Sequence, residues 1–405
     1  MIICVVVFGG ESEIEGVSRE QYMAAVINAK PSSMIRCSMG IGKPVLLHKI
    51  EGQISRVNGV HLLSTEEGVL TISDDRSLRI YLKRDNEQFW PSIYHYLPFS
   101  PNSMHFDEHK LRLFIGLING SVYEYKIAED MNSLSEQRHW LAHLSLVTAV
   151  LYSQEAELIF SCSKDKTTVW HCSETSVKMG YYTGESGFTA LEFDASSKFV
   201  FLGDSVGAII LLRLNGSEIN VVTTLSAHTN TITSLAWDSE RQLLFSAGAD
   251  HLVIMWDIGG KKGQAFELKA GGIPRMLHLN FSAHNNRLTC LQYAQHKKRL
   301  FRQMKTEVVG LRQHHCRTCG NAVCAKCCAN TTRYPPMGYE LPVRICNACQ
   351  SRMQQFPDQF DLTSLAVVSK LRQGVMCMHL QESTGRLVTA GSDRILMIWD
   401  VKQLV

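Results

Sequence analysis

The sequence has no apolar run long enough to cross a membrane as a helix. Its first apolar run, Ile2–Phe8, is short, whereas a membrane-spanning helix needs about 18–20 residues. No cationic stretch precedes this run and three glutamates follow it within residues 11–15, so a secretory signal is not indicated. We interpret residues 1–43 as an N-terminal leader. Its first part is either a β-strand or a spurious extension, and Met23 is an alternative start of the protein.

Strong charge of one sign is also missing. The 41 basic and 38 acidic residues give a net charge of only +3, which argues against nucleic acid as the main partner. Nucleophile elbows, P-loops and HExxH motifs are absent as well. We therefore expect neither an enzyme nor a nucleic-acid-binding protein. The 45% hydrophobic and 20% charged shares are those of an ordinary globular chain.

What the sequence does contain is a cluster of cysteines. Of the 13 cysteines, seven lie between residues 316 and 349. Without a secretion signal, such clustering indicates metal binding in a reducing compartment rather than a disulfide framework. We expect most of the scattered cysteines to be small buried side chains.

A self-similar unit of about 40 residues recurs along most of the chain. Its copies end in a tight turn followed by alternating apolar residues, which predicts a hairpin leading into a strand. The clearest tails are Ser73–Leu82, Ser163–Trp170, Gly248–Asp257 and Gly391–Asp400, and the weaker ones are Ile118–Tyr125 and Ser205–Leu214.

These units resemble WD40 repeats over roughly residues 44–300 and 365–402, and the resemblance implies an all-β, seven-bladed β-propeller. In that family an early histidine, a turn aspartate and a terminal tryptophan are hydrogen-bonded within one blade. The matching sets here are His143, Asp165 and Trp170, and His228, Asp250 and Trp256. Other copies depart from the pattern at Tyr81, Asn119 and Val206. We expect all of these residues to be structural.

The sixth repeat is predicted to be incomplete. It begins at His284, and Arg287–Phe301 supplies one strand, a turn and the start of a second strand. No Asp-x5-Trp tail follows, so two strands of this blade are expected to be missing and a sheet edge to be exposed. We expect the ring to close by pairing of N-terminal residues with the last blade.

Three Cys-x2-Cys pairs follow the sixth repeat. This spacing lets two thiolates bind one tetrahedral zinc ion. The pairs are Cys316 and Cys319, Cys324 and Cys327, and Cys346 and Cys349. Basic residues surround the first and precede the last pair, at Arg312, His314, His315, Arg317 and Arg344.

The strings RQHHCRTCG and VRICNAC resemble the FYVE zinc finger. The resemblance implies that Arg312, His314, His315, Arg317 and Arg344 form a pocket for the headgroup of phosphatidylinositol 3-phosphate. Gln313 replaces a residue that is usually basic. The family has four cysteine pairs in cross-brace order and two zinc ions. Here the first pair is missing, so Cys316, Cys319, Cys346 and Cys349 complete one Zn²⁺ site while Cys324 and Cys327 form half of another.

Both departures, the half blade and the missing cysteine pair, meet near Phe301, and one internal deletion explains both. The predicted domains are the repeats at 44–301, the finger at 302–355, and a linker with the last repeat at 356–405.

The order of repeats and finger is similar to that of propeller–FYVE proteins. This resemblance implies a scaffold in the cytosol and on early endosome membranes. The finger would bind phosphatidylinositol 3-phosphate and the propeller would bind protein partners, among which the family suggests serine/threonine kinases. Two alternatives remain open: a ubiquitin ligase, since RING fingers are also cross-braced, and a propeller that binds proteins but no lipid.

Overall fold

The computed structural model describes residues 2–7, 45–65, 68–216, 218–226, 228–240, 242–250, 252–258, 275–277, 288–294, 299–304, 314–315, 322–323, 330–334, 339–355, 366–370 and 374–402. Across these ranges the chain is almost entirely β, as predicted. Its strands form seven four-stranded sheets and two two-stranded sheets. None of the helical residues in these ranges belongs to a helix long and apolar enough to span a bilayer.

Five sheets each contain four consecutive antiparallel strands, and we call them blades 1 to 5. Blades 1 and 2 consist of β3 (Val57–Leu62), β4 (Gly68–Ser73), β5 (Ser77–Lys83) and β6 (Phe89–Tyr96), and of β7 (Pro101–Asp107), β8 (Arg112–Leu117), β9 (Ser121–Ile127) and β10 (Leu134–Leu141). Blades 3 and 4 consist of β11 (Val147–Ser153), β12 (Leu158–Ser163), β13 (Thr167–Cys172) and β14 (Lys178–Thr183), and of β15 (Phe188–Asp194), β16 (Phe199–Asp204), β17 (Ala208–Asn215) and β18 (Glu218–Ser226). Blade 5 consists of β19 (Ile232–Asp238), β20 (Leu243–Gly248), β21 (Val253–Asp257) and β22 (Arg275–Leu277).

A further blade, which we call the closing blade, joins the two ends of the repeat region. Its strands β30 (Val375–Gln381), β31 (Arg386–Gly391) and β32 (Leu396–Asp400) come from the last repeat. Its outer strand is β2 (Val45–Ile50), which runs antiparallel to β32 with Val45 opposite Asp400 and Ile50 opposite Leu396. The expected closure by N-terminal residues is therefore confirmed.

The seventh four-stranded sheet combines three separate segments, and we call it the composite sheet. The sixth repeat supplies β23 (Leu288–Ala294) and β24 (Arg299–Met304). The other two strands are β1 (Ile2–Val7) and β29 (Ala366–Lys370), with β1 between β24 and β29 and antiparallel to both. The edge of β24, which the sequence predicted to be exposed, is thus paired with β1.

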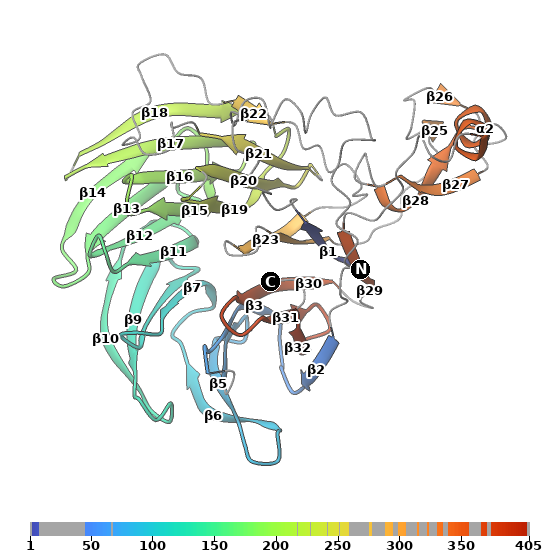
Figure 1. Ribbon diagram of the computed structural model, residues 1–405. Coiled ribbons are helices and arrows are strands. Elements are labelled where there is room, and N and C mark those ends of the chain that lie inside the picture. Colours follow the sequence, from blue (N-terminus) through green and yellow to red (C-terminus); the bar gives the residue numbers. More distant parts are fainter. Residues whose placement is uncertain are drawn as a thin grey trace, which may run out of the picture.

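The innermost strands of all these sheets follow one another around a ring (Figure 1). Contacts join β3 to β7, β7 to β11, β11 to β15, β15 to β19, β19 to β23, β23 to β30, and β30 back to β3. The composite sheet therefore lies between blade 5 and the closing blade. The described elements of the finger lie outside the ring, beyond β1 and β29 (Figure 1).

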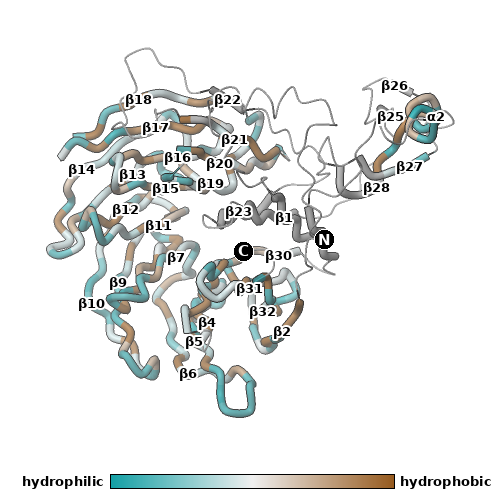
Figure 2. The backbone as a smooth tube through the Cα atoms, in the orientation of Figure 1, coloured by the Kyte–Doolittle hydropathy of each residue, from teal (hydrophilic) through white to brown (hydrophobic). Residues whose placement is uncertain are grey.

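The hydrophobic core lies between neighbouring sheets. The second strands of blades 1, 2, 4 and 5 are buried at every position, whereas nearly all residues of the outer strands β6 and β10 are exposed or half-buried. Separate apolar clusters join blade 1 to blade 2, blade 3 to blade 4, and blade 4 to blade 5. Figure 2 shows apolar residues along the strands and polar residues at the outer turns.

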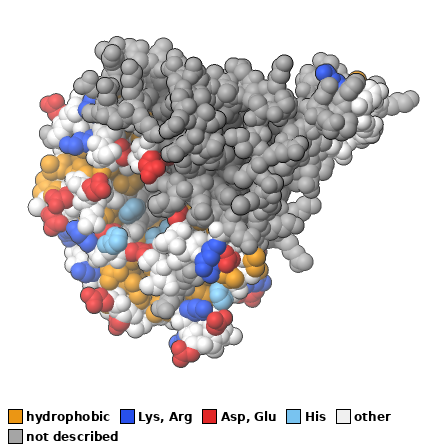
Figure 3. All heavy atoms as spheres, in the orientation of Figure 1, with side chains coloured by type: hydrophobic (Ala, Val, Ile, Leu, Met, Phe, Trp, Pro, Cys, Tyr) orange, Lys and Arg blue, Asp and Glu red, His pale blue; other side chains and the backbone are white. Residues whose placement is uncertain are grey.

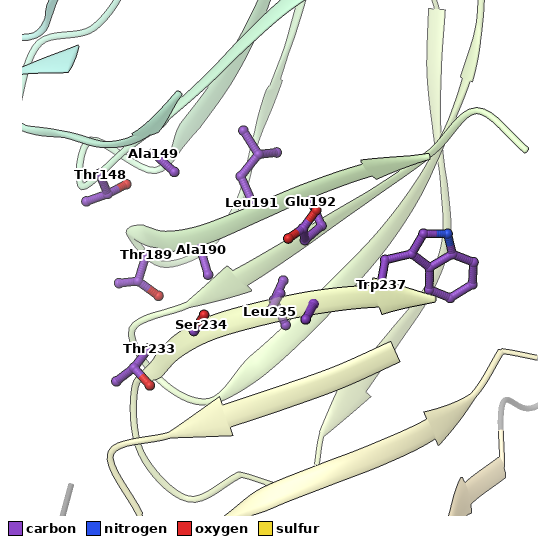
Figure 4. A pocket seen from close by; sticks show the side chains of 11 residues that line it. Thr148, Ala149, Thr189, Ala190, Leu191, Glu192, Thr233, Ser234, Leu235 and Trp237 are labelled. Carbon is purple, nitrogen blue, oxygen red and sulfur yellow. The ribbon is translucent and has the colours of Figure 1, made fainter. Parts of the chain in front are cut away.

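Hydrogen bonds also link the innermost strands in a repeated way. The second residue of each of four inner strands donates from its side chain to the carbonyl of the first residue of the next inner strand. These bonds run from Asn58 to Pro101 at 2.8 Å, Asn102 to Val147 at 3.1 Å, Thr148 to Phe188 at 2.9 Å and Thr189 to Ile232 at 2.6 Å. The corresponding places of Thr148, Thr189 and Thr233 on successive strands are visible in Figure 4. The ring is therefore joined by polar contacts as well as by apolar packing.

Candidate functional site

The finger contains two short hairpins and a helix. Strand β25 (His314–His315) pairs with β26 (Ala322–Val323), and β27 (Asn330–Tyr334) pairs with β28 (Tyr339–Ile345). Strand β25 also contacts β28. Helix α2 (Asn347–Gln355) follows β28 after a single residue.

The last cysteine pair lies at the junction of β28 and α2. Cys346 is buried and Cys349 is half-buried, and neither forms a disulfide. Cys346 packs in a small cluster with Ile345 and Met353, and Cys349 lies against that cluster. The carbonyl of Cys346 accepts a hydrogen bond from the N–H of Gln350 at 3.0 Å, so the pair spans the first helical turn. Two unbridged thiols in this position fit half of a tetrahedral zinc site.

Part of the predicted headgroup pocket is brought together on neighbouring strands. Arg344 is exposed near the end of β28, immediately before the buried Ile345. His314 and His315 form β25, which contacts β28. The alternation of a strand thus places Arg344 on the solvent side while Ile345 enters the core. Arg344 and the two histidines therefore lie on strands that contact each other.

The remaining predicted site residues lie outside the described residues. They are Arg312, Arg317, Cys316, Cys319, Cys324 and Cys327. Among the residues that the structure does describe, no group of three or more histidine, cysteine or acidic side chains is placed to hold a metal ion. The zinc sites therefore rest on the sequence pattern and on the fit of Cys346 and Cys349.

The predicted histidine–aspartate–tryptophan set is complete in blade 5. The Nδ1 atom of His228 lies 2.9 Å from Oδ2 of Asp250, and its Nε2 atom lies 2.8 Å from Oγ of Ser246. The indole N–H of Trp256 donates to the same Ser246 oxygen at 2.9 Å. All of these side chains form hydrogen bonds within the blade, which agrees with the structural role that the sequence predicted.

In blade 3 the predicted set is only partly correct. His143 lies 2.8 Å from Oγ of Ser161 and 3.4 Å from Oδ2 of Asp165. The indole N–H of Trp170, however, has no hydrogen-bond partner among the described residues. Trp170 lies opposite Phe160, the third residue of β12, and His171 lies opposite Ile159, the second residue. In blade 5, Trp256 likewise lies opposite the second residue of β20. His171, not Trp170, therefore occupies the position of the family tryptophan.

The reason is the spacing from the turn. Trp256 follows Asp250 by six residues, and Trp170 follows Asp165 by five. Successive side chains of a strand point to opposite faces, so an odd spacing turns Trp170 to the other face. There it packs with Phe160 and Phe188 of the cluster between blades 3 and 4. Counting the spacing, rather than matching the residue type, would have identified this difference.

The fourth blade has a substitute that the sequence analysis missed. Val206 stands where other copies have an aspartate, but the Oδ1 atom of Asp204 accepts from the backbone N–H of Val206 at 3.0 Å and of Ala208 at 2.7 Å. In the other turns, Asp or Asn accepts from the N–H two residues later, as Asp165 does from Thr167 at 2.9 Å. Asp204 therefore takes the acceptor role that an aspartate at position 206 would have, and the turn is preserved.

The inner wall of the ring carries a second group of polar residues. Glu192 lines a cavity of about 360 Å³ with Thr189, Leu235 and other residues of blades 3, 4 and 5 (Figure 4). Burial raises the pKa of Glu192 to about 8, because a low-dielectric environment disfavours the charged carboxylate. A further cavity on the side of blades 1 and 2 contains histidines and acidic residues, and it is taken up below.

Comparison with known proteins agrees with this arrangement. The family model of the FYVE zinc finger matches residues 301–355, and that of the WD domain, G-beta repeat, matches residues 219–257 and 366–400. The WD40 β-propeller domain of Doa1 shares the fold, with a TM-score of 0.59 at 14% identity over 89% of this chain and 97% of that one.

Two full-length relatives carry both modules. WD repeat and FYVE domain-containing protein 2 of Caenorhabditis briggsae is 47% identical over 94% of this chain and 98% of its own length. The Homo sapiens protein of the same name is 35% identical over 95% of this chain and 100% of its own length. The alignment with the former spans 423 positions, more than the 405 residues of this chain, so that relative has residues with no counterpart here. The chain belongs to the family of WD repeat and FYVE domain-containing proteins.

Proposed function

We propose that this protein is a peripheral scaffold of early endosome membranes. The finger binds phosphatidylinositol 3-phosphate, and the propeller binds protein partners, with serine/threonine kinases as candidates by family resemblance. The observation that carries the proposal is the position of Arg344, which is exposed on β28 beside the His314–His315 strand. A FYVE finger supplies a zinc-dependent lipid-binding module, and WD40 repeats supply a protein-binding one.

The headgroup pocket is proposed to contain Arg312, His314, His315, Arg317 and Arg344. Arginine binds phosphate oxygens through a planar fork of donors, and a rigid support limits the entropy lost on binding. The buried side chain of Ile345 fixes the backbone next to Arg344 in this way. Each basic residue near an anionic leaflet adds about 1 kcal/mol of attraction.

Zinc is proposed to hold this support together. Cys316, Cys319, Cys346 and Cys349 would bind one Zn²⁺, and Cys324 and Cys327 would provide half of a second site. The ion's part is structural, since a small finger obtains much of its folding free energy from the metal. Loss of the first cysteine pair is expected to weaken the finger around Cys324 and Cys327.

The propeller is proposed to have seven blades, with the composite sheet as the sixth. In support, β23 contacts the innermost strands on both sides, β19 and β30. Among the described residues, the sixth repeat provides β23 and β24, while β1 and β29 supply the other two strands of this sheet, which supports the proposal that the repeat is incomplete by itself. The finger is inserted between β24 and β29 of this sheet, which fixes its attachment to the ring.

The first experiment is co-sedimentation of the full chain with liposomes that contain or lack phosphatidylinositol 3-phosphate, together with zinc content per chain. We expect lipid-selective binding and an affinity about tenfold lower for Arg344→Gln, because a charge-assisted contact is lost. Arg352→Gln, at an exposed arginine in the last turn of α2, is the matched control and should bind as the unaltered chain does. Equal binding to both liposomes would refute lipid recognition by this chain.

The alternatives make different predictions. A cross-braced finger that acts as a ubiquitin ligase would show autoubiquitination in a reconstituted assay. A propeller without lipid binding would capture proteins but stay in the supernatant with zinc at one ion per chain or fewer. We propose no catalytic activity, since both matched families are binding modules.

A further inference from the structure

A cavity of about 700 Å³ lies among blades 1, 2 and 3 and the closing blade, and we call it the channel cavity. Among the described residues, its lining contains the carboxylates Asp107 and Glu108 and the histidines His61, His105 and His109, but no lysine or arginine. Histidine and acidic side chains lie close together near the middle of the described blades in Figure 3. The formal charge of the lining is therefore negative when the imidazoles are neutral.

Three histidines occupy matching places on three blades. His61, His105 and His379 are each the fifth residue of an innermost strand, namely β3, β7 and β30. The His61 and His379 rings are in contact, with their centroids 3.8 Å apart and their planes inclined at 32°. The Nδ1 atom of His379 accepts from the N–H of Leu62 at 3.2 Å, which fixes it as the unprotonated nitrogen.

Glu108 is held as a carboxylate at one side of the cavity. One of its oxygens lies 2.9 Å from Nε2 of His61, and both accept from the backbone N–H of Ser64 at 3.1 and 3.0 Å. Burial opposes ionisation, but these hydrogen bonds outweigh it and lower the pKa of Glu108. Glu108 is consequently negative at neutral pH.

One buried carboxylate oxygen beside the cavity has no hydrogen-bond partner among the described residues. The Oδ2 atom of Asp107 is buried and accepts no hydrogen bond from any described residue, although its Oδ1 atom accepts from the N–H of His109 at 3.0 Å. Burial lowers the pKa of His105 to about 4, so this imidazole is neutral and offers a lone pair. Buried acceptors without partners are costly and call for a donor.

The rest of the lining is apolar. Leu63, Phe106, Leu111 and Met131 contribute side chains to the same cavity. The guanidinium of Arg112 is nearby, over the Tyr152 ring at 4.9 Å, but it is paired with Glu124 at 2.8 Å. The cavity thus combines the two carboxylates Asp107 and Glu108 with an apolar wall, and it suits a ligand that has a cationic donor head on an apolar stem.

We propose that the channel cavity binds an arginine side chain presented by a protein partner. The guanidinium group supplies five donors and a positive charge, it is weakly hydrated, and it stacks on flat rings such as the imidazole of His105. The methylene stem would lie along the apolar wall. A bare metal ion is a poorer occupant, because no group of three ligand side chains is placed to hold one in the described part of the chain.

This inference extends the propeller's proposed partner-binding role and does not depend on lipid docking. It is tested in solution, without membranes, with the full chain labelled at histidine Cε1. N-acetyl-arginine methylamide is titrated while the histidine signals are followed by NMR in the presence of EDTA. We expect saturable shifts of the His61 and His105 signals, which single His→Gln variants assign.

Matched probes and variants separate charge from shape. The citrulline analogue replaces the guanidinium with a neutral urea of the same shape and should bind at least about tenfold more weakly. Asp107→Asn and Glu108→Gln should each weaken the arginine probe by about the same factor. Glu155→Gln changes an exposed acid in a neighbouring turn that does not line the cavity, and it should leave binding unchanged.

Three results would overturn the proposal: no saturable shift with the arginine probe, equal affinity for the citrulline probe, or full affinity in both cavity variants. Tighter binding of the lysine analogue would reject a guanidinium site in favour of an ammonium site. Since no lipid is present, these outcomes are independent of whether the finger binds liposomes.

Discussion

Ser246 and Ser161 occupy the same place in blades 5 and 3, but they serve different numbers of partners. Ser246 bonds both His228 and Trp256, whereas Ser161 bonds His143 alone. Both serines are buried, so every group that loses such a partner is left unsatisfied. At the scale of single residues, the contribution of a repeated motif to stability therefore depends on which neighbouring side chains form hydrogen bonds with it.

We predict that Ser246→Ala is more destabilising than Ser161→Ala. The first change removes the partner of two buried side chains and should lower the free energy of unfolding by about 2–4 kcal/mol. The second removes the partner of one and should cost about 1–2 kcal/mol. Urea unfolding followed by tryptophan fluorescence measures both, and equal losses would contradict the assignment of His171 to the tryptophan position.

We also predict an acid-sensitive contribution from His171. Burial lowers its pKa from 6.5 to about 4, with smaller effects of Lys178 and His143. The unfolded chain therefore takes up this proton first as the pH falls. The contribution of neutral His171 to the free energy of unfolding is complete above about pH 6.5 and is lost as the pH falls from 6.5 to 4.

The measurement is the free energy of unfolding at several pH values in that window. His171→Gln cannot be protonated and should reduce the acid-induced loss by about 1–3 kcal/mol. The remaining slope would come from other buried histidines such as His143, whose pKa burial also lowers. An unchanged slope in the variant would show that His171 does not titrate in this way.

At the scale of strands and turns, most of the ring could be predicted from the sequence. The repeat tails place the second and third strands of the blades, because an Asx turn between two apolar strands is a local signal. The partners of β1 could not be predicted, since a short apolar strand carries no information about which distant edge it joins.

The role of β1 can be tested by changing its backbone. Val5 lies opposite Phe301 of β24 and Val367 of β29, so a proline there removes a donor from a strand that has neighbours on both sides. We expect Val5→Pro to expose β24 and β29 to trypsin and to raise the cleavage rate after Arg302 and Lys370 by about tenfold or more.

Val5→Thr is the matched control, because threonine keeps the backbone donor and favours strands. It should be cleaved at the rate of the unaltered chain. Identical cleavage of the two variants would mean that β1 does not hold the composite sheet together.

At the scale of the whole molecule, the candidate sites differ in how much of each could be predicted from the sequence. The finger residues form a contiguous motif and could be identified before the fold was known. The channel cavity is lined by His61 and His105, and His61 contacts His379 of the last repeat, so these three residues meet only when the ring closes. No local pattern marks them, although their shared fifth place in the inner strands is a signal once the repeats are aligned.

Ring closure itself can be tested with a crosslink between β2 and β32. Lys49 lies opposite Met397, so Lys49→Cys combined with Met397→Cys places two thiols across the closing pair. Oxidation should stabilise the protein by about 2–4 kcal/mol, because the crosslink closes a very long loop of the unfolded chain. Urea unfolding with and without reductant measures the effect, and Lys49→Cys alone should show none. A double variant that forms no crosslink would contradict the pairing.

The pairing of β2 with β32 also bears on how the protein is made. A ribosome releases the N-terminal residues first, and units of a chain generally fold as they emerge. Blades 1 to 5 use strands that are consecutive in the chain, so each can assemble during synthesis. Strand β2 must wait for Leu396–Asp400, which are translated after all of blades 1 to 5. The nascent protein is therefore an open arc in which β2 has no partner, and we expect that strand to need protection by a chaperone until β32 has been made.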